Sequence, residues 1–131
     1  MIPRFRAYDS GSCTRMYEPY EVMVGDGDIW VINEDDDGRW IVNNDLHLMQ
    51  STGLKDKNDR EIFEGDILKV TNLSSWLEVV SFNENKAMFV SKETKREVEE
   101  TPLYDLFNTD IFEVEIIGNI YENPELVEVS S

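Results

Sequence analysis

Apolar and polar residues alternate along much of this chain, in short runs separated by turn-forming residues. Alternation with a period of two places successive side chains on opposite faces of a β-strand. Alternation predicts strands over residues 5–8 and 112–117, and short apolar runs bounded by turn formers predict further strands over 29–33, 39–43, 61–70, 76–82 and 87–91. The sequence therefore predicts a mainly β protein.

A β-hairpin is predicted over residues 29–43. Its two runs, 29–33 and 39–43, are rich in β-branched and aromatic residues, and an Asp-Gly dipeptide at the end of the intervening segment favours a turn. Period two places Trp30 and Trp40 where they are expected to pair across the strands. Because a lone hairpin is only marginally stable in water, we expect this one to pack on further structure.

Three glycines are expected to serve backbone geometry. Gly65 interrupts the run 61–70, where it indicates a tight bend or bulge, and Gly118 indicates the same in the last strand. Gly53 stands in the Ser-Thr-Gly segment before a charged hexapeptide and also fits a position with special backbone angles.

A short helix is predicted over residues 101–107. Thr101 is expected to be its N-cap and Pro102 its first helical residue, and apolar residues follow at helical spacing. The hexapeptide 55–60 mixes positive and negative charges with turn formers, so it is predicted to be an exposed loop.

The 131 residues suit one compact unit with two regions. Residues 1–50 are expected to form an N-terminal β region that contains the tryptophan hairpin, and residues 51–131 a β-barrel-like core. Within that core, residues 61–122 are predicted to form a small SH3-like or related barrel with the one short helix.

The formal net charge is −16, from 28 acidic and 12 basic residues. Tracking a phosphate backbone requires clustered lysine and arginine, so this balance disfavours direct nucleic-acid binding and adsorption to anionic membranes. The acidic surface either keeps the protein soluble or attracts a basic partner.

No apolar run approaches the roughly 20 residues of a membrane-spanning helix, and no signal-peptide pattern follows the charged start. The single cysteine, Cys13, cannot form an internal disulfide. These features fit the bacterial cytoplasm.

Candidate chemistry is sparse. Residues 33–38 partly match an EF-hand calcium loop, but Asn44 stands where the bidentate glutamate belongs and the flanks are predicted strands. His47 and Cys13 lack partners at zinc-ligand spacing, and His47 fits a strand residue in partly polar surroundings. No nucleophile motif or phosphate-binding loop is present. We therefore assign no catalytic, cofactor-binding or metal residue.

Four aromatic residues have two interpretations. They could stack on bases, as in single-strand-binding barrels, but stacking normally operates beside a basic groove. Packing in the core is the favoured role for most of them. They are Trp30, Trp40, Trp76 and Phe89.

Three segments carry a resemblance to a known family. They are the opening Arg4–Asp9, the central 49–67 with its Ser-Thr-Gly-Leu-Lys-Asp and Phe-Glu-Gly-Asp-Ile stretches, and the closing Ile117–Leu126. In these the chain resembles the YopX family of phage- and prophage-encoded proteins. The resemblance implies a phage or prophage origin and action in the bacterial host cytoplasm, and it transfers no activity and no catalytic residue.

The sequence favours a non-enzymatic accessory protein that binds another protein. The acidic surface would steer it toward a basic partner, and short edge strands would allow a homo-oligomer. Two alternatives remain open. One is an acidic mimic of nucleic acid that inhibits a DNA-binding protein, and the other is a metal-assisted enzyme.

Overall fold

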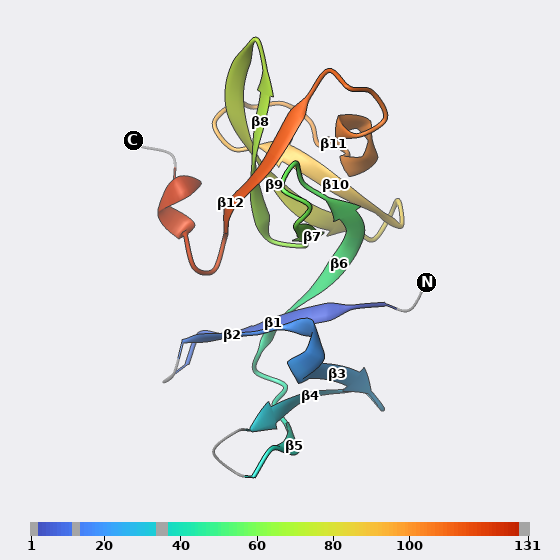
Figure 1. Cartoon of the computed structure of the whole chain (residues 1–131), viewed down its shortest axis with the longest axis vertical. Coiled ribbons are helices and arrows are strands. Elements are labelled where there is room, and N and C mark those ends of the chain that lie inside the picture. Colours follow the sequence, from blue (N-terminus) through green and yellow to red (C-terminus); the bar gives the residue numbers. More distant parts are fainter. Residues whose placement is uncertain (1–2, 12–13, 34–36, 129–131) are drawn as a thin grey trace. The chain divides into compact units, whose positions relative to one another are not determined.

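Strands dominate the computed structural model, which describes residues 3–11, 14–33 and 37–128 (Figure 1). In these ranges the helical segments are single 3₁₀ turns of three or four residues. The prediction of a mainly β protein is confirmed. The chain divides into two compact units, residues 1–51 and 52–131.

The first unit contains two antiparallel groups of strands. In one, β1 lies between β2 and the beginning of β6, and in the other the order is β3-β4-β5. The elements are β1 (Phe5–Asp9), β2 (Arg15–Tyr17), the 3₁₀ turn η1 (Pro19–Glu21), β3 (Val22–Gly25), β4 (Asp28–Asn33), β5 (Arg39–Val42) and β6 (His47–Lys55).

One face of β3-β4-β5 supplies the core of this unit. Val31 is fully buried with Ala7 and Leu46, and Val22 and Ile29 pack against that cluster. Since side chains alternate along a strand, Trp30 and Ile32 of β4 lie on the opposite face. The apolar run 29–32 is therefore divided between a buried face and an outer one.

The predicted hairpin is present, but the expected pairing of its tryptophans is wrong. Trp30 lies opposite Val42, and Trp40 lies opposite Ile32. The two indoles share a face and are offset by two residues, because the pair Asn33 and Arg39 closes the hairpin and fixes that register. Residues 34–36 of the predicted turn lie outside the described residues. The hairpin was expected to need further structure for stability, and β3 supplies part of it by pairing with β4.

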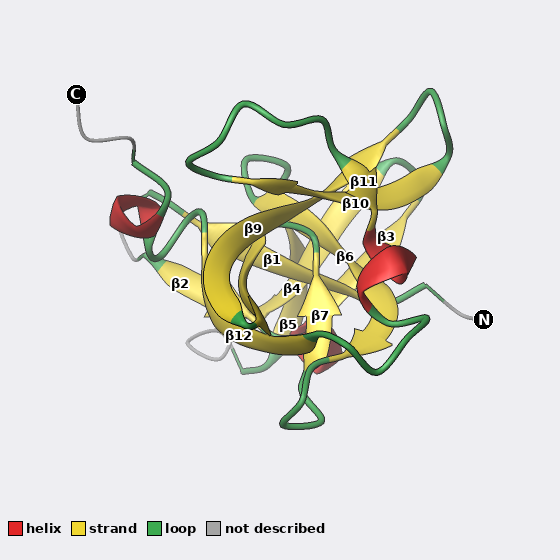
Figure 2. Ribbon diagram, turned by 90° about the horizontal axis from the view of Figure 1, so that it is seen from above, coloured by secondary structure: helices red, strands yellow, loops and turns green. Residues whose placement is uncertain are grey.

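The second unit is built around the sheet β11-β10-β9-β8-β12, whose strands curl into a half-barrel (Figure 2). Its core combines Ile62, Leu68, Val70 and Val80 with two leucines of the 3₁₀ turn and two residues of the last strand. Besides the end of β6, the elements are β7 (Glu61–Phe63), β8 (Asp66–Asn72), β9 (Ser74–Asn83), β10 (Met88–Glu93), β11 (Thr101–Pro102), η3 (Leu103–Leu106), β12 (Glu113–Asn119) and η4 (Pro124–Leu126).

The predicted short helix is the 3₁₀ turn η3, and its capping was predicted wrongly. Thr101 pairs with Ser91 in the two-residue strand β11, and Pro102 is the N-cap. The sheet register with β10 holds residue 101 in strand geometry, so the turn begins at Leu103. Leu103 and Leu106 are buried, as their spacing indicated.

The glycine bends are present. Gly53 and Gly65 have φ angles of 80° and 84°, which an L-residue with a side chain rarely adopts. The register between β12 and β8 shifts between Ile116 and Gly118, so the last strand carries a bulge at the predicted place.

Gly118→Ala is expected to destabilise the protein by about 2 kcal/mol, because a Cβ there would overlap the side chain of Asn123, whose Oδ1 accepts from the backbone N–H of Asn119 at 3.2 Å. That Cβ would lie 2.4 Å from Oδ1 and 3.1 Å from Cβ of Asn123. The matched control is Gly25→Ala, whose added Cβ meets nothing within 4 Å. Urea unfolding measures both, and equal effects of the two substitutions would refute the explanation.

Leu73→Asn is expected to stabilise the protein by about 0.5–1 kcal/mol. Leu73 connects β8 to β9 with a φ of 61° and an exposure of 106%, and asparagine adopts this left-handed conformation more readily than leucine. Ile111→Asn is the control, since Ile111 is also exposed but has no positive φ. Thermal unfolding should shift upward only for Leu73→Asn.

Candidate protein-binding surface

The outer face of β3-β4-β5 is apolar from edge to edge. We use this name for Met23, Trp30, Ile32, Trp40 and Val42. Directly paired residues of antiparallel strands share a face, and Met23, Trp30 and Val42 form one such row while Ile32 and Trp40 form the next. Met23, Trp40 and Val42 are 48%, 40% and 44% exposed. Large exposed apolar areas of this kind characterise interaction sites.

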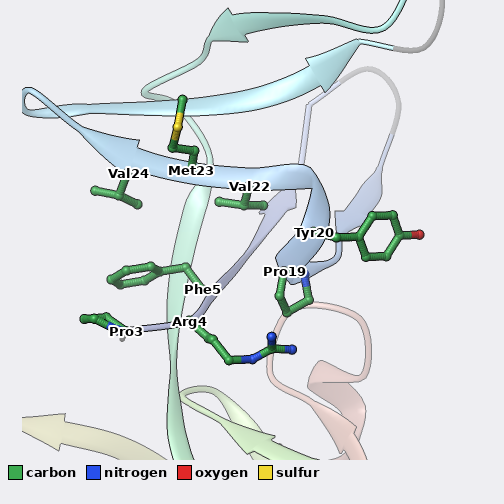
Figure 3. Close-up of a pocket in the computed structure, with 8 residues that line it drawn as sticks. All are labelled: Pro3, Arg4, Phe5, Pro19, Tyr20, Val22, Met23 and Val24. Atoms are coloured by element: carbon green, nitrogen blue, oxygen red, sulfur yellow. The ribbon is translucent and has the colours of Figure 1, made fainter. Parts of the chain in front are cut away.

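A groove of about 650 Å³ lies beside β3, on the side opposite the outer face (Figure 3). Val22 and Val24 point from β3 toward Phe5 and Pro3, whereas Met23 points the opposite way. Pro19, Met23, Arg4 and the exposed Tyr20 complete the groove's lining. Apolar surface thus lies on both sides of β3 within the first unit.

Negative charge is concentrated around the hairpin that carries the outer face. Residues 26–45 contain seven acidic side chains and one basic one, Arg39, for a formal charge of −6. The rest of residues 1–50 contains three of each sign. The entire net charge of the first fifty residues therefore belongs to this hairpin and its flanks.

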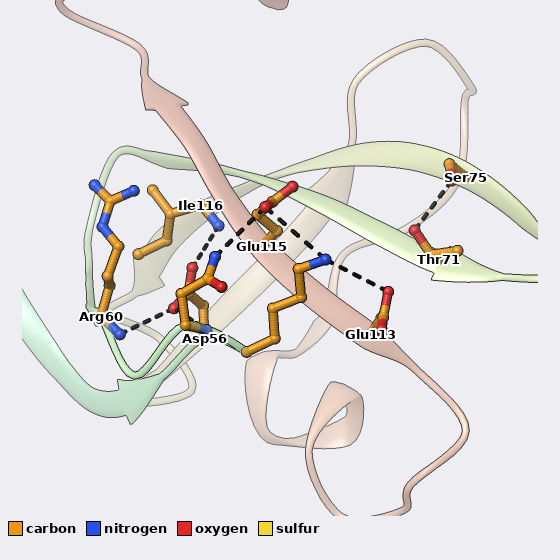
Figure 4. A network of polar contacts seen from close by, with 9 residues as sticks. Asp56, Arg60, Thr71, Ser75, Glu113, Glu115 and Ile116 are labelled. Atoms are coloured by element: carbon orange, nitrogen blue, oxygen red, sulfur yellow. Dashed lines mark hydrogen bonds and ion pairs between the residues drawn. The ribbon is translucent and has the colours of Figure 1, made fainter.

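The charged hexapeptide 55–60 was predicted to be exposed, and for Asp56 this is wrong. Its carboxylate is buried and accepts hydrogen bonds from the backbone N–H groups of Ile116, Arg60 and Asn58, at 2.9, 2.9 and 3.0 Å (Figure 4). Burial raises the pKa of Asp56, but these donors and the nearby Arg60 charge outweigh it, so the pKa lies below its usual value of 3.8.

Salt bridges surround this loop on the β12 side. Lys57 Nζ lies 3.6 Å from a carboxylate oxygen of Glu113 and 3.9 Å from one of Glu115. Together with Asp56, these contacts attach the hexapeptide to the last strand of the second unit. The Asp56 carboxylate, in the middle of the sequence motif, thus fixes the backbone of the loop and of β12.

The residues weighed for metal or catalytic chemistry have structural partners. Asn44 donates to Asp28 and accepts from the backbone N–H of Ile29, both at 2.9 Å, so the residue at the EF-hand glutamate position instead ties the chain after β5 to the start of β4. His47 lies in β6, half-buried, with Nε2 3.1 Å from the hydroxyl of Ser10. Cys13 and residues 34–36 lie outside the described ranges. Within those ranges no three His, Cys, Asp or Glu side chains form a metal-binding group.

The four aromatic residues divide between the two units. In the second unit, Trp76 and Phe89 pack against the core. Trp76 donates its indole N–H to the buried Glu78 at 2.7 Å, and Ser91 donates to the other carboxylate oxygen at 2.6 Å. In the first unit, Trp30 and Trp40 lie on the outer face instead. The prediction of core packing is confirmed for Trp76 and Phe89 and fails for the exposed Trp40.

Sequence reasoning missed one strand of this surface. Val22–Gly25 forms the strand β3, which was obscured by Pro19 and by the short distance to the next turn. The residues of a two-residue turn could have revealed this strand. Gly25 pairs with Asp28 across Asp26 and Gly27, and both turn residues have a positive φ. Elsewhere, the long strand β6 (His47–Lys55) was absent from the predicted strands, although His47 itself was expected to be a strand residue.

The family model described as YopX protein matches residues 4–128. The chain belongs to the YopX family. The resemblance in the three sequence segments is thereby confirmed over nearly the whole chain. A crystal structure of the protein EF1440 from Enterococcus faecalis is similar to this YopX-family chain, with a TM-score of 0.64 and 27% identity. The match covers 98% of this chain and 99% of that one.

A search among curated proteins finds no significant match to this YopX-family chain. Over the described ranges, no helix is long and apolar enough to span a membrane.

Proposed function

We propose that this YopX-family protein is a non-enzymatic accessory protein of a phage or prophage that binds another protein through the outer face of β3-β4-β5. The observation that carries the proposal is a sheet that is apolar on both faces while only one face contributes to the core. Exposing Met23, Trp40 and Val42 on the second face lowers solubility, and binding a partner would cover these side chains. Tryptophan and methionine are also enriched in protein–protein interfaces.

Charge supports a protein partner over a nucleic acid. The outer face lies on a hairpin region with a formal charge of −6, in a chain of net charge −16. Phosphate groups would be repelled there, whereas a basic protein surface would be steered toward it. The family resemblance supports a bacterial host cell as the setting.

A capture experiment with the full chain tests this function. Host lysate is incubated with the tagged wild type and with two tagged variants. The outer-face variant is Met23→Thr/Trp40→Thr/Val42→Thr. The control, Leu73→Asn/Tyr104→Thr/Ile111→Thr, changes three exposed apolar residues of the second unit. We expect one or more proteins to be retained by the wild type and the control and lost from the outer-face variant. Equal retention by all three, or retention of nucleic acid in place of protein, would refute the proposal.

The charge also predicts how association responds to salt. The association rate of the captured partner should fall at least about tenfold between 50 and 500 mM salt, because screening shortens the range of electrostatic steering. Stopped-flow or surface-based kinetics measure this rate. A rate that is independent of salt would contradict the involvement of the acidic hairpin.

A further inference from the structure

The strand β5 is an edge of the three-stranded sheet. Its pairing with β4 shows which of its backbone groups face β4 and which face the open edge. The backbone N–H of Asn43 donates to the carbonyl of Ile29 at 2.8 Å, and Val31 lies opposite Ile41 two residues further along. Bonded and non-bonded pairs alternate in an antiparallel ladder. The N–H and C=O groups of Trp40 and Val42 therefore point away from β4, toward the open edge of the sheet.

Past the exposed Arg39 that begins this four-residue strand, the edge lacks the usual protection against pairing. Exposed edge strands normally carry a charge, a proline or a bulge that blocks another strand. Trp40, Ile41 and Val42 are consecutive, apolar and 37–44% exposed, and no bulge interrupts their register with β4. The edge therefore offers backbone groups and apolar side chains together, which is what recognition by strand addition uses.

Charge complementarity identifies the occupant. The region 26–45 that contains β5 has a formal charge of −6, with four consecutive acidic residues, 34–37, in the connection before β5 and Asp45 shortly after it. A second copy of the chain would bring two such regions together. A strand flanked by lysine or arginine would instead bring positive charges to a region whose seven acidic residues outnumber its one basic residue, Arg39.

We propose that β5 accepts an extended segment of a partner protein as a fourth strand of the β3-β4-β5 sheet. The segment has apolar residues at alternate positions, which contact the outer face beside Trp40 and Val42, and basic residues at its ends. The inference rests on the proposed function for the existence of a partner. It adds that recognition runs through the backbone of the β5 edge.

The test uses the full chain and a synthetic peptide, Lys-Lys-Val-Thr-Val-Thr-Val-Lys-Lys, with a second peptide in which glutamate replaces each lysine. Amide hydrogen exchange is followed by NMR with and without peptide. We expect the basic peptide to slow exchange of the Trp40 and Val42 amides at least about tenfold, since these are the outward donors. The Ile41 amide, which already faces β4, should change little. The acidic peptide should bind at least about tenfold more weakly at low salt.

A backbone variant adds a second readout. Val42→Pro removes the outward N–H at an edge position that tolerates proline, and Val42→Thr keeps that N–H while reducing apolarity. Val42→Pro should weaken binding at least about tenfold, and Val42→Thr should weaken it less. If Val42→Pro fails to fold, the exchange pattern of the wild type still decides.

Three results would overturn strand addition. They are peptide binding without protection of Trp40 and Val42, equal binding by Val42→Pro and the wild type, and concentration-dependent protection of both amides without peptide, which would identify a second copy as the occupant. Each leaves the capture experiment with the outer-face variant unaffected, so failure of strand addition is distinguishable from failure of the proposed function.

Discussion

Replacing Asp56 with alanine is expected to lower the free energy of unfolding by about 3 kcal/mol, because it orphans three backbone donors at once. The donor on Ile116 belongs to a buried residue 60 positions away along the chain, and those on Asn58 and Arg60 shape the hexapeptide. Urea unfolding followed by circular dichroism measures the loss.

Asp59→Asn is the matched control for this substitution. Asp59 lies in the same loop, its side chain is 84% exposed, and its ion pair with Lys55 is long at 3.6 Å. Exposed pairs of this kind contribute little, and asparagine tolerates the positive φ of 64° at this position. We expect a change within about 0.5 kcal/mol. An Asp56→Ala cost as small as that of Asp59→Asn would contradict the role given to Asp56.

The effect of Asp56 should also depend on pH. Its pKa in the folded protein is depressed below 3.8, so the folded state binds the proton less tightly than the unfolded state does. The stabilisation is therefore complete above the unfolded pKa and is lost as pH falls through the folded one. Unfolding curves of the wild type and Asp56→Ala should differ equally between about pH 7 and 5 and converge below about pH 4. A gap that widens on acidification would contradict the depressed pKa.

The outer-face variant is expected to raise the Kd of the captured partner at least about 100-fold, because central aromatic and apolar anchors contribute most of the energy of an interface. Threonine preserves strand propensity, so the fold should persist. Isothermal titration calorimetry with the purified partner measures the change, and circular dichroism checks that the variant is folded.

A matched variant separates this effect from a general loss of surface apolarity. Leu73→Asn/Tyr104→Thr/Ile111→Thr removes three exposed apolar side chains from the second unit, each at least 60% exposed. The Kd of the partner should change less than about threefold. A comparable loss of affinity in both variants would show that the outer face has no special role.

Local patterns were sufficient to predict the hairpins and bends. The runs 29–33 and 39–43 are rich in β-branched and aromatic residues with turn chemistry between them, and Gly65 and Gly118 interrupt apolar strands where a bend and a bulge occur. These features depend on residues close together in sequence. Propensity and turn geometry therefore determine them without reference to the rest of the chain.

Contacts between distant residues could not be predicted in the same way. Nothing near Asp56 indicates that Ile116 will donate to it, so a charged hexapeptide was interpreted as wholly exposed. The pairing of Trp30 with Val42 depends on which residues close the hairpin. A period of two alone does not distinguish this register from one shifted by two residues. Both errors concern pairing, which the order of polar and apolar residues does not specify.

The candidate surface illustrates a third limit. The strand β4 is apolar on both faces, with Ile29 and Val31 on one side and Trp30 and Ile32 on the other. Periodicity cannot tell which pair is buried. Only the packing of Val31 with Ala7 and Leu46 shows that the tryptophan side faces outward.

The most direct test of the binding role is a hydrogen-exchange footprint of the full chain with the captured partner. We predict that protection gained on binding falls on β3, β4 and β5, over residues 22–24, 28–33 and 39–43. Protection confined to residues 52–128, with these three strands unchanged, would contradict the assignment of the outer face as the binding surface.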